Sequence, residues 1–113
     1  MNISLLLTVI MMVESGGDVN AVGDNGKALG PFQIHEAFWT DACDFGGVDW
    51  DYRTCAHDLE KSRQVVLWYW QRYVPEKEWS YERLARVHVG GPQGHLKECT
   101  LPYWNKIKDR LDE

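Results

Sequence analysis

The sequence predicts a mainly α-helical fold of the α+β class, with about five helices and one small β-hairpin. Several stretches repeat apolar residues at the three- and four-residue spacing of an amphipathic helix. One Asn-Gly pair, a strong hairpin signal, lies in a turn-rich segment near the N-terminus. Alternating segments that would form further strands are too few for a sheet-based fold. With 113 residues, the chain fits one domain that spans residues 1–113.

The N-terminal stretch MNISLLLTVIMMV predicts a first helix from about Ile3 to Ser15, because it is almost continuously apolar. Two glycines follow it and supply the backbone freedom that ends helices. Residues 18–30 are rich in turn-forming residues. Within them, Asp-Asn-Gly at residues 24–26 tolerates positive φ, which predicts a short hairpin.

The middle of the chain predicts two further helices. One begins near Pro31, since proline suits the first turn of a helix. The other covers residues 55–74, where apolar and aromatic residues alternate with charges at helical spacing, and Pro75 ends it. The acidic loop between them, residues 43–54, does not have the spacing of a calcium-binding loop, so we expect a solvated loop.

The C-terminal part predicts the last two helices. SYERLARVHV, residues 80–89, has helical spacing and is stopped by Gly-Gly-Pro. TLPYWNKIKDRL, residues 100–111, begins with Thr100 as a plausible cap.

Composition and charge exclude some classes of function. The net charge of −5 and the lack of a basic stripe argue against binding to nucleic acid. Three cysteines, Cys43, Cys55 and Cys99, form no zinc pattern, and the four histidines have no paired metal spacing, so no metal site is predicted. Two states of the thiols fit equally well: a Cys43–Cys55 disulfide with one free thiol, or three reduced thiols.

The apolar stretch 1–13 raises the question of a signal peptide. It has no positively charged leading segment and no small-residue cleavage site before Glu14, so we expect the first, largely buried helix of the domain instead. It is also too short to span a bilayer, and no membrane span is expected.

Two carboxylates, Glu14 and Asp24, stand ten residues apart in unlike surroundings. Glu14 ends an apolar helix, where partial burial raises the pKa of a carboxyl because the charged form loses hydration. Asp24 lies in a polar turn. One protonated and one charged carboxyl are what glycoside hydrolysis needs. The spacing alone is a weak signal, because a glutamate at a helix end is usually a surface residue and an aspartate before Asn-Gly is usually a turn residue. Asp18 is a competing second carboxylate, although its neighbourhood reads as a turn.

Other kinds of catalytic site fit less well. Ser15 and His88 could form part of a hydrolase dyad, but the nucleophile elbow G-x-S-x-G does not occur. The glycine-rich loops that hold nucleotides are missing as well, and no cofactor is expected.

Three blocks of the sequence carry a resemblance to a known family. ESGGDVNAVGDNGKALGPFQI resembles the N-terminal motif of lysozyme-like muramidases, and is most similar to the block that soluble lytic transglycosylases share with invertebrate-type lysozymes. ARVHVGGPQGH…TLPYW and FWTDAC…YRTCAHD are similar to the later and middle blocks of invertebrate-type lysozymes and their bacterial and phage relatives. The blocks cover nearly the whole chain, in order.

The resemblance implies a lysozyme-like fold that acts as a monomer on bacterial peptidoglycan, at the β-1,4 bond between N-acetylmuramic acid and N-acetylglucosamine. Glu14 matches the catalytic acid, and Asp24 the second carboxylate, a nucleophile or charge stabiliser. Lytic transglycosylases generally lack that aspartate and form 1,6-anhydro products with the acid alone, so this reaction is the alternative. A non-catalytic wall-binding module is a third possibility.

The resemblance also assigns substrate-binding positions. Ser15 and Gln33 match residues that line the cleft around the acid, and His88, Gly90 and Gly91 match the opposite wall. Val89 departs from the family pattern, which has asparagine there. The few cysteines suggest a bacterial or phage relative, with action on the cell wall in the periplasm or outside the cell after export by an unidentified route.

Overall fold

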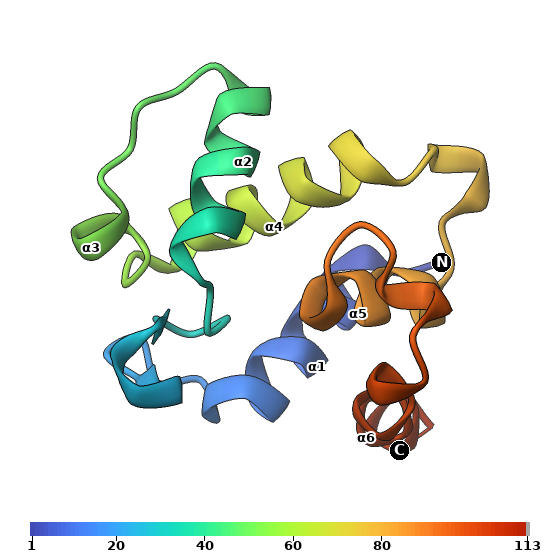
Figure 1. The fold of residues 1–113 in the computed structure, drawn as a ribbon. Coiled ribbons are helices and arrows are strands. Elements are labelled where there is room, and N and C mark those ends of the chain that lie inside the picture. The colour runs from blue at the N-terminus through green and yellow to red at the C-terminus, as the bar shows by residue number, and fades with distance from the viewer. Residues whose placement is uncertain (113) are drawn as a thin grey trace.

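The computed structural model describes residues 1–112, and these form a mainly helical fold with a small two-stranded sheet (Figure 1). This confirms the predicted fold class. The described residues contain six α-helices: α1 (Ile3–Ser15), α2 (Glu36–Gly46), α3 (Tyr52–Cys55), α4 (Leu59–Tyr73), α5 (Tyr81–Gly90) and α6 (Leu101–Leu111). The antiparallel strands are β1 (Val22–Gly23) and β2 (Ala28–Leu29), joined by a 3-10 turn at Asp24–Gly26.

The helices pack in two groups that meet along one shared core. Helix α2 packs across α4, while α1 lies against α5 and α6, and a contact between α4 and α5 joins the groups (Figure 1). The hairpin follows α1 and precedes α2, so it lies beside both groups (Figure 1). This arrangement brings the end of α1, the hairpin and the end of α5 to one side of the molecule.

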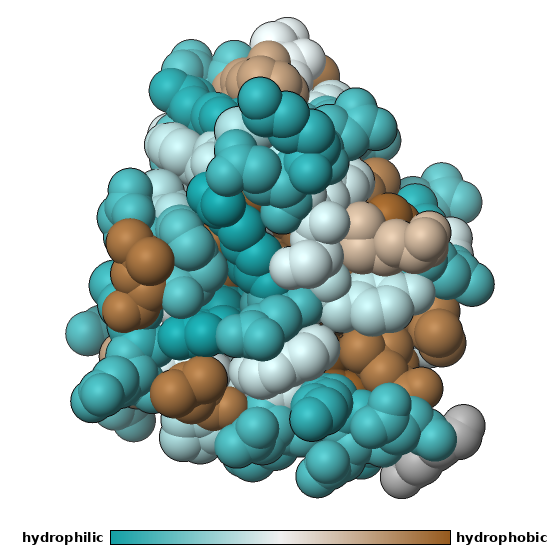
Figure 2. All heavy atoms as spheres, turned by 90° about the vertical axis from the view of Figure 1, so that its right-hand side faces the viewer, coloured by the Kyte–Doolittle hydropathy of each residue, from teal (hydrophilic) through white to brown (hydrophobic). Residues whose placement is uncertain are grey.

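Large apolar side chains from every long helix fill the core. Two tryptophans, Trp39 of α2 and Trp70 of α4, are almost completely buried together with Leu84 of α5 and Ile107 of α6. Burying an aliphatic side chain of this size contributes about 1.5–3 kcal/mol, so contacts between helices hold the fold together. The face of the molecule that lies on the right in Figure 1 is mostly hydrophilic, and its apolar atoms form small separate groups (Figure 2).

Short polar side chains fix where the helices start. Asn2, Asp58 and Ser80 each accept a backbone N–H from the first turn of α1, α4 and α5. Such a cap replaces one of the hydrogen bonds that a helix end lacks. Helix α1 has the predicted bounds, and Gly16, with a left-handed φ of 67°, closes it. No helix in residues 1–112 is long and apolar enough to cross a membrane.

The predicted start of the second helix near Pro31 is wrong, since α2 begins at Glu36. Leu29 and Ile34 exchange backbone hydrogen bonds of 3.1 and 3.0 Å, which fold the segment between them into a tight loop. Gln33 there has a φ of 51°, which no helix permits. Pro31 therefore lies in a turn and not in the first turn of a helix.

The predicted helix over residues 55–74 also differs, because α3 and α4 are separate. Asp58 accepts the N–H of Lys61 at 2.9 Å and starts α4 anew after the break. Thr100 precedes α6 as expected but makes no capping hydrogen bond, because its hydroxyl bonds to neighbours in the preceding loop. The three cysteines are all free, so the structure has three thiols and no Cys43–Cys55 disulfide.

Gly30 provides a test of how tightly the hairpin packs. Its φ is +81°, and a Cβ would lie 1.8 Å from the carbonyl oxygen of Ala56. Because backbone cannot move aside like a flexible side chain, Gly30→Ala should lower the free energy of unfolding by about 3 kcal/mol or more. Chemical denaturation measures this.

Gly26→Ala is the matched control. Gly26 has a similar φ of +88°, but a Cβ there meets nothing within 4 Å. It should lose only the cost of a left-handed backbone, about 1–2 kcal/mol. Equal losses in the two variants would contradict the close approach at Gly30.

Candidate active site

A cleft of about 430 Å³ lies between the end of α1, the hairpin and the end of α5. Both predicted carboxylates, Glu14 and Asp24, line it. The remaining lining residues come from β2, the loop between β2 and α2, α2, α4, α5 and the residue after α5: Ala28, Gln33, Ile34, His35, Phe38, Tyr69, His88, Val89 and Gly91. The structure thus brings together residues that are widely separated in the chain.

Glu14 sits in the last turn of α1 with its side chain only 18% exposed. Two groups approach the same carboxylate oxygen, Oε2. The hydroxyl of Tyr103 on α6 donates to it at 3.0 Å, and Nε2 of His88 on α5 lies 3.3 Å away. We call these two groups the acid clamp. It fixes the carboxyl plane and occupies Oε2.

The loop after β2 supports the acid from a third side. The hydroxyl of Ser15, the residue after Glu14, donates to the carbonyl of Pro31 at 2.8 Å. Nε2 of His88 lies 3.1 Å from the carbonyl oxygen of Phe32. The end of α1 and the end of α5 therefore both make hydrogen bonds to this loop, which fixes the position of Glu14 relative to the cleft.

Tyr103 is suited to be a permanent donor. Burial first, and then the charge of Glu14 and the hydrogen bond to it, raise the pKa of the Tyr103 phenol. The phenol therefore keeps its proton near neutral pH. Sequence reasoning missed this residue, although it lies within the TLPYW block that carries the resemblance. Nothing local in that block indicates a contact with Glu14.

Asp24 has very different surroundings from those of Glu14. It begins the 3-10 turn of the hairpin with a φ of +50°, a conformation that aspartate tolerates better than most residues. Its side chain is 59% exposed, and Oδ2 lies 3.1 Å from Nε2 of His35. The sequence singled out no role for His35, which immediately follows the GPFQI run.

The predicted binding residues divide into two groups. Gln33, His88 and Gly91 line the cleft. Ser15 and Gly90 are not among the lining residues. The Ser15 hydroxyl bonds to backbone and not to His88, which disfavours the hydrolase dyad.

Gly90 and Gly91 illustrate this division. At Gly90 a Cβ would lie 2.7 Å from the Thr100 side chain, so the absence of a Cβ lets Thr100 pack against the end of α5. At Gly91, whose φ is +82°, the nearest atom would be the Tyr69 hydroxyl oxygen at 3.9 Å. Gly91 therefore leaves the backbone open to the cleft.

One wall of the cleft is aromatic. The rings of Phe38 and Tyr69 stack with their centroids 3.8 Å apart and their planes within 9°. Burial raises the pKa of Tyr69 to about 12, so its hydroxyl is neutral. Val89, 41% exposed, adds an apolar edge. Within residues 1–112, no group of His, Cys, Asp and Glu side chains has a geometry that could hold a metal ion.

Comparison with known proteins gives consistent matches. A family model described as Destabilase matches residues 4–110. Lysozyme 1 of Crassostrea virginica is 38% identical over 86 residues, which cover 74% of this chain and 45% of that protein. A lysozyme of Meretrix lusoria is 36% identical over 109 residues, which cover 90% of this chain and 84% of that protein. The chain thus spans less than half of the first relative and most of the second.

The solved structures agree with the sequence matches. The crystal structure of Tapes japonica lysozyme superimposes with a TM-score of 0.77 at 31% sequence identity, over 92% of this chain and 86% of that chain. The superposition therefore extends over most of this chain and most of that lysozyme. On sequence and fold together, the chain belongs to the Destabilase family of invertebrate-type lysozymes.

Proposed function

We propose that the chain is a peptidoglycan muramidase that hydrolyses the β-1,4 bond between N-acetylmuramic acid and N-acetylglucosamine. One observation carries this proposal: a sheltered carboxyl, Glu14, and a solvated one, Asp24, line the same cleft. Glycoside hydrolysis uses two carboxyl groups with opposite tasks, and unlike environments separate those tasks. The family relationship supplies the substrate class.

Glu14 is the general acid in this mechanism. Both groups of the acid clamp reach Oε2, so Oε1 is left to carry the proton toward the glycosidic oxygen. As the bond to the leaving sugar breaks, the proton passes from Oε1 to that oxygen and Glu14 becomes a carboxylate. The clamp then stabilises the charge that forms, because the Tyr103 hydroxyl already points at the carboxylate.

Asp24 supplies negative charge on the other side of the bond. Positive charge grows at the anomeric carbon in the transition state, and a carboxylate close to it either bonds to that carbon or stabilises the charge. His35 contacts Oδ2 and so orients Asp24, leaving Oδ1 for the sugar. Water completes the reaction and takes the place of the leaving sugar.

The cleft walls suit a polysaccharide chain. Stacked aromatic rings present a flat face that accommodates the apolar side of a sugar ring. The exposed backbone at Gly91 allows polar groups of the substrate to come close, since glycine has no Cβ. Both carboxylates and both walls of the cleft belong to a single chain, which is consistent with the proposal that the protein acts as a monomer.

The alternative reaction, lytic transglycosylation, needs only the acid. The position of Asp24 in the cleft favours hydrolysis, because a transglycosylase has no use for a second carboxylate there. With peptidoglycan as substrate, the chain would act at the bacterial cell wall, in the periplasm or outside the cell.

Glu14→Gln tests the general acid. The amide can still accept from Tyr103 but has no proton to deliver, so lysis of purified peptidoglycan should fall by about 10²- to 10⁴-fold. Circular dichroism should show an unchanged fold. Glu36→Gln, an exposed residue outside the cleft lining, is the matched control and should stay active. Full lysis by the Glu14 variant would exclude this assignment.

Product analysis tests the reaction. The wild-type chain should release muropeptides with reducing ends in mass spectra.

Asp24→Asn tests the second carboxylate. The Asn variant should lose activity at least about a hundredfold, since the charge at the anomeric carbon is gone. Asp18→Asn, an exposed carboxylate of the next turn, should behave as wild type. Anhydro ends, or a mild loss at Asp24, would favour transglycosylation.

Tyr103→Phe tests the acid clamp. It removes one hydrogen bond to the acid while keeping the ring, so kcat should fall about tenfold with little change in KM. Tyr81→Phe is the control, because the Tyr81 hydroxyl accepts the N–H of Asn2, far from the cleft. Equal kcat values for the Tyr103 variant and the wild type would show that His88 alone suffices.

A further inference from the structure

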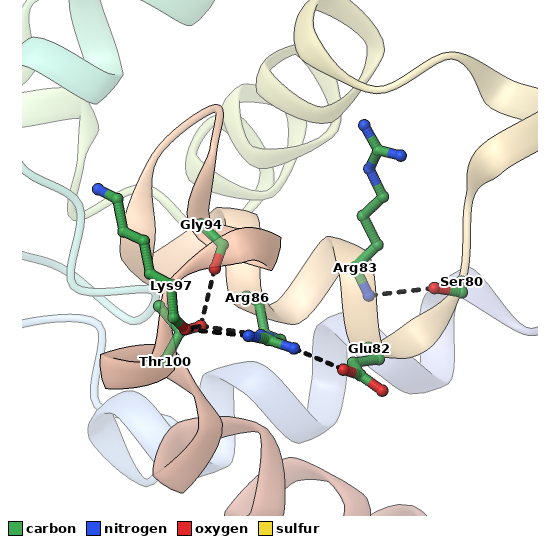
Figure 3. A network of polar contacts seen from close by, with 7 residues as sticks. All are labelled: Ser80, Glu82, Arg83, Arg86, Gly94, Lys97 and Thr100. Carbon is green, nitrogen blue, oxygen red and sulfur yellow. Dashed lines mark hydrogen bonds and ion pairs between the residues drawn. The ribbon is translucent and has the colours of Figure 1, made fainter.

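Arg86 is an arginine in the middle of α5 with its side chain only 10% exposed. Its guanidinium makes two contacts with loop residues on one side and one contact with Glu82 on the other (Figure 3). Nε donates to the hydroxyl oxygen of Thr100 at 2.8 Å, Nη2 donates to the carbonyl of Lys97 at 2.9 Å, and Nη1 pairs with Glu82 at 2.6 Å. A buried charge with its donors satisfied in this way is costly to disturb.

The loop between α5 and α6 folds back over this guanidinium. The Thr100 hydroxyl donates to the carbonyl oxygen of Gly94 at 2.8 Å (Figure 3). Lys97 Nζ donates to the carbonyl of Gly90 at 2.8 Å. At Gly94 a Cβ would lie 2.1 Å from the carbonyl oxygen of Arg86. The loop therefore packs directly on the backbone of α5, with Arg86 at its centre.

Arg86 connects the two helices that carry the acid clamp. His88 follows it by two residues on α5, and Tyr103 follows Thr100 by three residues at the start of α6. Both side chains reach Oε2 of Glu14. The spacing between α5 and the start of α6 thus decides whether both donors can meet one oxygen atom.

We propose that Arg86 is a positioning residue for the catalytic acid: through Thr100 and Lys97 it fixes α6 against α5, and so holds Tyr103 and His88 on the same oxygen of Glu14. This inference rests on the proposed function of Glu14. Arg86 itself touches neither the acid nor the cleft lining. Its effect passes through the loop and the first turn of α6.

Arginine is required for this task because of its geometry. Nε and Nη2 point along one edge of the planar group and contact two loop oxygens at once, which a lysine ammonium cannot do at the same reach. The third contact adds less, since Glu82 is 46% exposed and water screens the pair. The positioning therefore depends on the two loop contacts.

Other charged groups surround this site and must be kept constant in the test. Glu82 and Arg83 lie on α5 itself, and Lys97 lies in the loop. His95 in the loop is also close: burial first, and then the charges of Arg83 and Arg86, lower its pKa. Arg86→Lys keeps a positive charge at this position. It removes the paired hydrogen bonds that the planar guanidinium makes with Thr100 and Lys97.

The experiment compares Arg86→Lys and Thr100→Val with two matched controls. Arg83→Lys changes an arginine three residues away that pairs with Glu78 instead, and Thr100→Ser keeps the hydroxyl. Arg86→Lys and Thr100→Val should lower kcat on soluble peptidoglycan fragments at least about tenfold and keep KM within about twofold. They should also change the pH profile, because His88 and Tyr103 no longer both contact Oε2 of Glu14. Both controls should keep the kcat and pH profile of the wild type.

A second measurement does not depend on activity. Tyrosine carbon NMR, assigned with Tyr103→Phe, follows the titration of the Tyr103 phenol. In the wild type this phenol should not titrate where exposed tyrosines do, because burial and Glu14 raise its pKa. In Arg86→Lys and Thr100→Val it should titrate at lower pH, since the loosened first turn of α6 exposes it.

The outcomes separate this proposal from the function on which it rests. Variants with lower thermal stability but wild-type kcat, pH profile and Tyr103 titration would show that Arg86 only stabilises the fold, and would overturn the proposal. If Arg86→Lys does not fold, Thr100→Val decides by the same criteria. If the wild type does not cleave peptidoglycan, the proposed function fails, while the Tyr103 titration still tests the connection between the helices.

Discussion

The structure depends on one constraint: a carboxyl group removed from most of its water must have hydrogen-bond donors that stay in place. Glu14 meets this constraint with donors from α5 and α6, so three helices have to converge at one oxygen atom. His88, the donor from α5, also contacts the carbonyl oxygen of Phe32. The apolar core beneath this contact includes buried side chains of the same three helices: Leu6 of α1, Leu84 of α5 and Ile107 of α6.

Asp24 shows the opposite solution for a carboxylate. It stands on a turn with three successive left-handed residues, and water and His35 satisfy it without help from the core. A hairpin of two-residue strands suffices for this, because the Asp24 carboxylate itself does not have to be buried. The division of labour between the two carboxyls thus follows from the elements that carry them: a helix end packed on two other helices, and an exposed turn.

Local features of the structure could be predicted from the sequence, whereas contacts between distant segments could not. The apolar run with its glycine stop gave α1 its predicted bounds, and Asp-Asn-Gly gave the hairpin. The start of α2 was misplaced because the Leu29–Ile34 bridge, and not the proline, decides the path of that segment. Glu14 was found through its motif, whereas its partner Tyr103 lies 89 residues away.

The glycines of the later block show why a motif alone cannot assign roles. Gly90 and Gly91 are adjacent and identical, yet one makes room for the Thr100 methyl and the other opens the backbone to the cleft. Gly90 is the last residue of α5 and faces Thr100 of the loop that Arg86 contacts, whereas Gly91 follows the helix with a φ of +82°. A motif that includes Gly-Gly therefore encodes both a wall of the cleft and the packing behind it. In the mechanism that we propose, substrate contacts at Gly91 and the position of Tyr103 depend on the same loop, so substrate binding and proton delivery share one support.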